Sequence, residues 1–175
     1  VDPTRAGLAP GVTFVQFLAP GLLASACVQS ASFEAAWPVM GKLVWYGNYK
    51  AVVSTPLDAG DLVVGELIWI GLRATAIATT FMGVMVAFGV APVSIESGLA
   101  IPAAVLTGLA FSALIIPLAA VLKQASQFNV VFRFVVTPLF LFSGVFFPIS
   151  RIPERIQWLA TLSPLFHGVE MTRGL

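Results

Sequence analysis

Four long apolar stretches follow one another along the chain, with short polar segments between them. The stretches without Asp, Glu, Lys or Arg are residues 6–33, 74–95, 97–122 and 134–150. A hydrocarbon layer about 30 Å thick requires a helix of about 20 apolar residues. Three stretches have this length, and the fourth reaches it if it begins near Val130 and includes Arg133. The pattern therefore predicts four membrane-spanning helices.

Prolines and polar residues set the expected limits of these helices. The first should end before Pro38, because the residue before a proline disfavours the helical conformation. The second should be the inner part of a longer helix that begins near Ala59, with Asp58 as its N-cap. Ala91 and Pro92 should end that helix. We expect the four spans at residues 12–36, 67–90, 98–122 and 130–147.

The segment between the first two spans, residues 37–66, is too polar to cross a membrane. The chain has four Trp and two Tyr residues, and this segment holds Trp37, Trp45 and both tyrosines. Such a group is typical of an aromatic belt at one membrane face. Residues 48–55 predict a helix of about two turns. A helix this short needs a surface to lie on, and the residues alone leave membrane and protein equally open.

The composition agrees with a protein that lies in lipid. The chain has 58% hydrophobic and 10% charged residues, whereas soluble domains have about 25% charged residues. Backbone groups in lipid must be hydrogen-bonded internally, so we expect an all-α polytopic membrane protein. The net charge of +1 and the lack of a basic cluster give no reason to expect a nucleic-acid partner. Cys27 lies in the first expected span and should be a small packing residue.

The basic residues of the connections indicate an orientation. Lys42, Lys50, Lys123 and Arg133 fall on one side of the membrane, and the short connection of residues 92–97 has no Lys or Arg. Arg5, Arg151, Arg155 and Arg173 fall on the opposite side, so the total count is level. The connections between the spans favour the cytoplasm for the first side.

Arg73 is the costliest residue by position, because it lies in an expected span about 9 Å beyond Leu67. Its side chain could reach the interface, or it could line a substrate path. Glu66 is seven residues earlier on the same face, so the two side chains could form a pair or share a water-filled vestibule. Arg133 allows the same interpretations, and for Glu34 an interface role and a substrate role both remain open.

The chain lacks the patterns of an enzyme site. Gly41 and Lys42 do not continue as a phosphate-binding loop, because Leu43 follows where Ser or Thr is required. His167 and Glu170 are three residues apart on one helical face, but two ligands are too few for a metal site. We therefore expect no catalytic residue, cofactor or metal in this chain, and a protein that is not an enzyme.

A specific pattern lies near the end of the chain, S-G-x-F-F-P from Ser143 followed by L-x-P-L-x-H-x-V-E that ends at Glu170. With this pattern, the stretches Phe17–Ala35, Tyr49–Glu66, Leu106–Leu114 and Thr137–Glu170 resemble the membrane subunits of type-2 ABC exporters, the ABC-2 permeases. The resemblance is strongest to the branch with the nodulation lipo-oligosaccharide export permease and the daunorubicin-type drug resistance permeases.

The resemblance implies that residues 1–175 are one incomplete ABC-2 transmembrane domain, which holds the second to fifth of six spans. Residues 48–55 would be the cytoplasmic coupling helix, in which Tyr49, Lys50 and Val53 touch the ATPase. Residues 148–172 would form an extracellular re-entrant helical hairpin that caps the exit. The resemblance makes Glu66, Arg73, Arg133, His167 and Glu170 candidates for the pathway or its gating.

The function implied by the resemblance is that of a permease subunit in a prokaryotic cytoplasmic membrane. A separate ATPase, which binds ATP and Mg, would drive alternating access of two permease copies within the membrane lipid. The substrate would be lipid-linked, a glycolipid or an amphipathic drug, moved out of the cytoplasm. A membrane scaffold or assembly protein without transport activity is one alternative, and a fragment of a secondary transporter is another.

Overall fold

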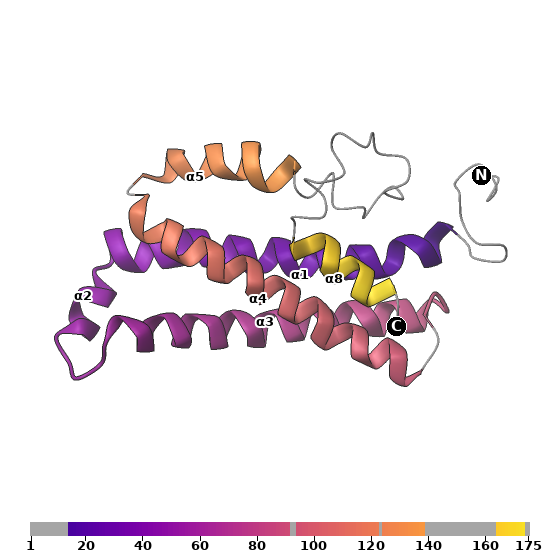
Figure 1. Cartoon of the computed structure of the whole chain (residues 1–175). Coiled ribbons are helices and arrows are strands. Elements are labelled where there is room, and N and C mark those ends of the chain that lie inside the picture. Colours follow the sequence, from indigo (N-terminus) through magenta and orange to yellow (C-terminus); the bar gives the residue numbers. More distant parts are fainter. Residues whose placement is uncertain (1–13, 92–93, 123, 139–163, 174–175) are drawn as a thin grey trace.

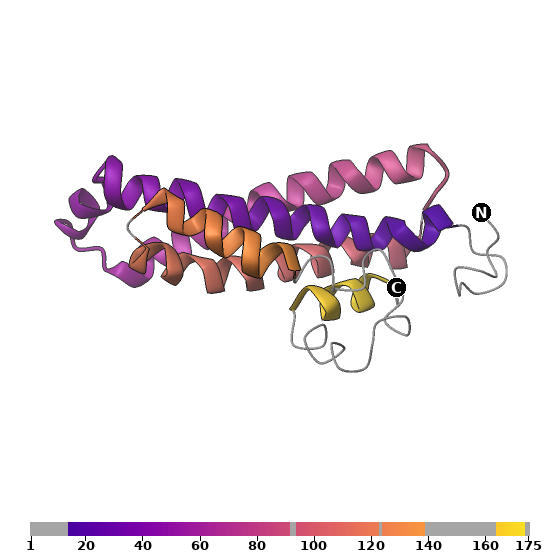
Figure 2. The same ribbon diagram turned by 90° about the horizontal axis from the view of Figure 1, so that it is seen from above.

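The computed structural model describes residues 14–91, 94–122, 124–138 and 164–173, and every regular element in these ranges is a helix. Three long helices, α1, α3 and α4, run side by side, and α8 lies against α1 and α4 (Figures 1 and 2). The short α2 lies at the end of the bundle where α1 ends and α3 begins (Figure 1). The elements are α1 (Phe14–Met40), the π-helix η2 (Gly41–Trp45), α2 (Asn48–Val53), α3 (Ala59–Ala87), α4 (Ile95–Val121), α5 (Ala125–Val131), the π-helix η3 (Phe132–Val136) and α8 (Pro164–Arg173).

The first helix does not end before Pro38, so that prediction is wrong. α1 continues through Pro20 and Pro38 to Met40 and passes directly into η2. Proline removes a backbone hydrogen bond from a helix, but the residues around Pro38 are held by tertiary packing. Val39 and Met40 are buried beside α3 and α4, and this burial offsets the lost bond.

Two of the described helices are long and apolar enough to cross a membrane, namely Ala59–Ala87 and the Ser97–Val121 part of α4. α1 has 27 residues but carries Gln29 and Glu34. It packs against α3, α4 and α8, and Glu34 has its partners on α3, whereas Gln29 is exposed. The prediction of four spans remains a prediction for α1 and for residues 130–147, of which the last nine lie outside the described residues.

The start of α3 agrees with the sequence. Asp58 Oδ1 accepts hydrogen bonds from the backbone N–H groups of Gly60 and Asp61, and Asp61 Oδ2 accepts one from the Asp58 N–H. This reciprocal capping box satisfies donors that a helix start leaves free. The prediction that Asp58 caps a helix from Ala59 is confirmed.

α1 and α4 approach closely along a seam of small residues. Ala104, Gly108 and Ser112 lie four residues apart on α4. A Cβ atom at Gly108 would lie 3.1 Å from the Cys27 carbonyl oxygen and 3.2 Å from Ala31 Cβ. Ser112 Oγ donates to the Ala31 carbonyl oxygen at 3.2 Å. Small residues at this spacing let helices pack in lipid, where the hydrophobic effect between helices is absent.

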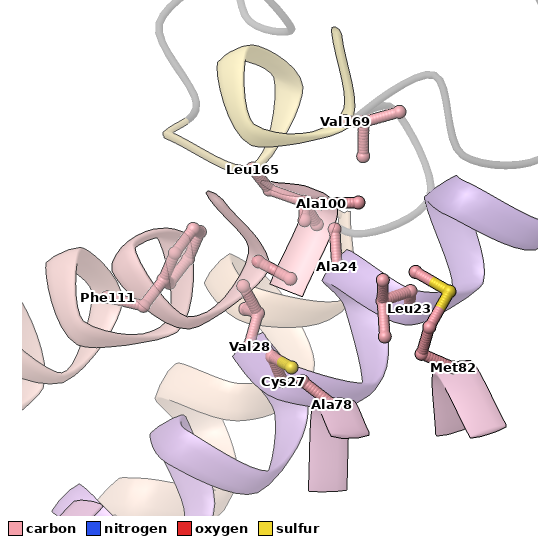
Figure 3. Close-up of a cluster of buried hydrophobic side chains, with 11 residues drawn as sticks. Leu23, Ala24, Cys27, Val28, Ala78, Met82, Ala100, Phe111, Leu165 and Val169 are labelled. Atoms are coloured by element: carbon pink, nitrogen blue, oxygen red, sulfur yellow. The ribbon is translucent and has the colours of Figure 1, made fainter. Parts of the chain in front are cut away.

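The core forms two adjoining apolar clusters along α1. One cluster joins α1, α3, α4 and α8 (Figure 3), and it includes Cys27, whose predicted packing role is confirmed by its complete burial. The other cluster lies toward the α2 end. Its members are Ala31, Ala35, Ala36, Val39, Met40, Ile70, Ile115, Ile116, Ala119 and Phe128.

α8 packs on α1 and α4 and covers the last part of residues 148–172, where a helical hairpin is expected. A Cβ atom on Gly168 would overlap the side chain of Thr107 on α4. Thr172 is buried and its hydroxyl donates to the carbonyl oxygen of Gly168 at 3.0 Å. The first part of the expected hairpin, residues 148–163, lies outside the described residues, so the re-entrant arrangement remains a prediction.

Candidate functional site

Three elements meet at the carboxylate of Glu66 on α3. Its Oε1 accepts a hydrogen bond from Lys42 Nζ of η2 at 2.5 Å and one from the Tyr49 hydroxyl of α2 at 2.7 Å. Glu66 is only 8% exposed, and its Oε2 is buried without a hydrogen-bond partner among the described residues. We call Lys42, Tyr49 and Glu66 the Glu66 cluster.

The local backbone explains why Tyr49 reaches Glu66. Gly47 has φ 65°, a left-handed conformation that glycine adopts without strain, and it serves as the N-cap of α2. The chain therefore turns sharply between η2 and α2, and Tyr49 packs against the core cluster at this end. Burial, the hydrogen bond to Glu66 and the charge of Glu66, in decreasing order of size, raise the pKa of Tyr49 above its usual value.

A second polar cluster joins α1 and α3. Arg73 Nη1 donates to Glu34 Oε2 at 2.7 Å, and Trp69 Nε1 donates to Glu34 Oε1 at 3.2 Å. The Glu34 side chain is 13% exposed and that of Arg73 is 53% exposed. We call these three residues the Glu34 cluster.

A pair of Arg73 with Glu66, one of the two arrangements considered for these residues, does not form, because the two side chains bind different partners. Seven residues of helix separate them by about 10 Å along the axis of α3. Glu34 on α1 lies within reach of Arg73, and Lys42 on η2 lies within reach of Glu66. The charges of Glu66 and Arg73 are thus each matched by a neighbouring element rather than by their own helix.

The other candidate residues are spread over the molecule. Lys50 is exposed on α2, and Arg133 is exposed on η3. His167 and Glu170 are exposed on α8, where the His167 ring lies 5.3 Å from that of Phe166. α8 lies well away from α2 along the bundle (Figure 1), so the structure does not bring His167 or Glu170 to the Glu66 cluster. Val53 belongs to α2, as expected.

Sequence reasoning missed Lys42 as a partner and left Trp69 unmentioned. Lys42 is 24 residues from Glu66, and no local pattern relates the two positions. The pairing of Glu34 with Arg73 could have been inferred from the sequence. Opposite charges in neighbouring apolar helices avoid a high desolvation cost when they pair.

An apolar cavity of about 270 Å³ lies between α1, α4, η3 and α8. Gln29 and Thr137 are its polar lining residues, and the apolar ones are Val28, Phe111, Phe132, Val136 and Leu165. Within the described ranges, no group of three or more His, Cys, Asp or Glu side chains is placed to hold a metal ion. The polar clusters bind one helix to another through charge.

Two helices long enough and apolar enough to cross a membrane, with ion pairs that join neighbouring elements, are typical of an integral membrane protein domain. The family model of the ABC-2 type transporter matches residues 2–175, so the chain belongs to the ABC-2 transporter family.

Curated relatives agree with this assignment. The chain is 30% identical over 167 residues to Nodulation protein J of Rhizobium leguminosarum bv. viciae, and these cover 95% of this chain and 64% of the relative. It is 33% identical over 168 residues to Nodulation protein J of Sinorhizobium fredii, covering 95% and 63%. The chain thus spans less than two thirds of the length of these relatives. No solved structure matches the chain.

Proposed function

We propose that this chain is part of the permease subunit of an ABC exporter in a prokaryotic cytoplasmic membrane. The observation that carries the proposal is the family match over almost the whole chain. The structure adds support, because a short helix, α2, lies at the end of the bundle where a coupling helix is expected. ATP and Mg would bind to a partner ATPase, and this chain would contribute helices that rearrange.

In this proposal α2 docks on the ATPase through its exposed side. Lys50 is exposed there, whereas the Tyr49 hydroxyl is turned toward Glu66 of its own chain. Lys50 therefore remains a proposed ATPase contact, together with Val53. Tyr49 instead holds α2 against α3 through its hydrogen bond to Glu66.

The substrate would be lipid-linked, a glycolipid or an amphipathic drug, and two permease copies would alternate between inward-open and outward-open states. The apolar cavity, with one amide and one hydroxyl in its lining, is compatible with an amphipathic ligand. The exposed half of Arg73 has no place against lipid, so we propose that it lines the path between the copies. Arg133, His167 and Glu170 remain candidates for the path or its gate.

The test is to purify the full-length permease with its ATPase and to measure ATP hydrolysis and export in vesicles. We expect ATP-dependent export, and Lys50→Gln should reduce the stimulation of ATP hydrolysis. Ser94→Asp is a matched control, because it shifts the net charge by the same amount in the α3–α4 connection and keeps a capping side chain. A permease that neither retains nor stimulates the ATPase would refute the proposal and favour a scaffold role or a secondary transporter.

A further inference from the structure

The Glu66 cluster is the place where the predicted coupling helix is bonded to the long helices. Tyr49 belongs to α2, Glu66 to α3, and Lys42 to η2, which continues α1 without a break. Both bonds end on the same carboxylate oxygen, Oε1 of Glu66. One side chain thus joins α2 to the two helices that flank it in the sequence.

We propose that Glu66 is a positioning residue that fixes α2 to α1 and α3, so that the three elements move as one unit. This inference rests on the proposed function for its role in transport, but its structural part stands without it. It also changes the expected role of Glu66, which acts on the coupling helix and not on the substrate path.

The need for such an anchor follows from the size of α2. The helix has six residues, and an isolated helix of this length does not persist in water. Its described backbone bonds include those from the Lys50 and Ala51 N–H groups to the Gly47 carbonyl oxygen. Tyr49 and Val52 are half-buried, whereas Asn48, Lys50 and Ala51 are exposed. Tyr49 packs on the core cluster at this end and also hydrogen-bonds to α3 through its hydroxyl.

The burial of Glu66 indicates that its role is to fix the position of α2, not to stabilise the fold. A buried carboxylate is costly to desolvate, and a hydrophobic residue would often be at least as stable. Here one oxygen is bonded twice and the other is buried without a described partner. Such a directional arrangement fixes the place and the angle of α2, which apolar contact alone specifies less well.

In transport, the Glu66 cluster would transmit movements of α2 to the long helices. A movement of α2 passes through the Tyr49–Glu66 bond to α3 and through the Glu66–Lys42 pair to the end of α1. Without the Tyr49–Glu66 bond, α2 should move while α1 and α3 stay in place. The ATPase would still bind, since the exposed side of α2 is unchanged, but fewer substrate molecules would cross for each ATP hydrolysed.

The experiment measures hydrogen exchange of the α2 amides in the full-length permease without ATPase, and export per ATP in the complex. Tyr49→Phe should raise the exchange rate of the Lys50 and Ala51 amides at least about tenfold, the effect of losing one bond to a charged acceptor. Glu66→Gln keeps an acceptor oxygen and removes only the charge, so it should raise the rate by a smaller factor. Amides in the middle of α4 should keep their rates. The α2 amides of the double variant should exchange hardly faster than those of Tyr49→Phe, because Tyr49 holds α2 through its bond to Glu66.

Two variants serve as matched controls for α2 exchange. Tyr46→Phe removes a hydroxyl from the exposed neighbouring tyrosine, and Glu34→Gln neutralises a carboxylate in the other cluster. Unchanged α2 exchange in both Tyr49→Phe and Glu66→Gln overturns the proposal, as does released α2 with unchanged export per ATP. If the wild-type permease fails to engage an ATPase, the proposed function fails, and faster α2 exchange in the variants still supports the anchor.

Discussion

Glu34 of α1 and Arg73 of α3 are 39 positions apart in the chain and form an ion pair with an Oε2–Nη1 distance of 2.7 Å. Trp69 donates to the other oxygen of the same carboxylate. Arg73 therefore satisfies its charge inside the bundle with a neighbouring helix. The pair joins α1 to α3 at a second position, seven residues beyond Glu66 along α3.

Loss of Arg73 should destabilise the bundle. Arg73→Gln leaves the mostly buried Glu34 without its cation, at an expected cost of about 1–3 kcal/mol. The exchange Glu34→Arg with Arg73→Glu rebuilds an ion pair and should recover most of the loss. Thermal unfolding in detergent measures both effects. If the exchanged variant is no more stable than Arg73→Gln, the pair does not hold α1 to α3.

Export by the exchanged variant then separates the two roles of Arg73. A purely structural pair predicts that export returns together with stability. A side chain that contacts substrate predicts that stability returns while export stays low, because the cation has moved to the other helix. We expect the second result, since half of the Arg73 side chain is exposed in the single chain.

Gly47 should be needed for the turn that presents Tyr49 to Glu66. Its φ of 65° is unfavourable for residues with a Cβ atom, and no atom lies within 4 Å of the place where that Cβ would be. Gly47→Ala should therefore cost about 1–2 kcal/mol from conformation alone. Faster exchange of the α2 amides would report the effect. Gly65→Ala, also in open space but without a positive φ, is the control and should have no such effect.

Gly168 should be required for the contact of α8 with α4. Alanine there would overlap Thr107, and overpacking of this kind costs about 1–3 kcal/mol. Thr107→Gly should restore part of the packing in the double variant because it removes the atoms that clash. Protease protection of α8 and thermal unfolding measure the change. A Gly168→Ala variant as stable as the wild type would contradict the observed packing.

The parts of the fold that sequence predicted are those set by local residues. The α3 start follows from Asp58 and Asp61, which cap the helix within one turn. The apolar stretches give α3 and α4 their length. These signals need no knowledge of distant contacts.

The parts that sequence missed depend on distant contacts. α1 passes through Pro38 because α3 and α4 bury the residues beside it, and a local rule cannot include that packing. A pair of Arg73 with Glu66 was one possibility because both lie on one helix, but the carboxylate that binds Arg73 belongs to α1. Tyr49 was expected to face a partner protein, and only the turn at Gly47 shows that it faces its own chain.

Titration of Tyr49, followed by tyrosinate absorbance, tests its contact with Glu66 directly. The chain has two tyrosines, so Tyr46→Phe leaves Tyr49 as the sole source of a tyrosinate absorbance signal. Burial and Glu66 raise the pKa of Tyr49 in the folded state, so its neutral form is favoured by folding. The stabilisation is complete below about pH 10, the unfolded pKa, and is lost as pH rises through the higher folded value. We expect little ionisation of folded Tyr46→Phe at about pH 10, and a lower pKa when Glu66→Gln is added. A folded midpoint equal to that of the unfolded chain would show that Tyr49 is neither buried nor bonded to Glu66.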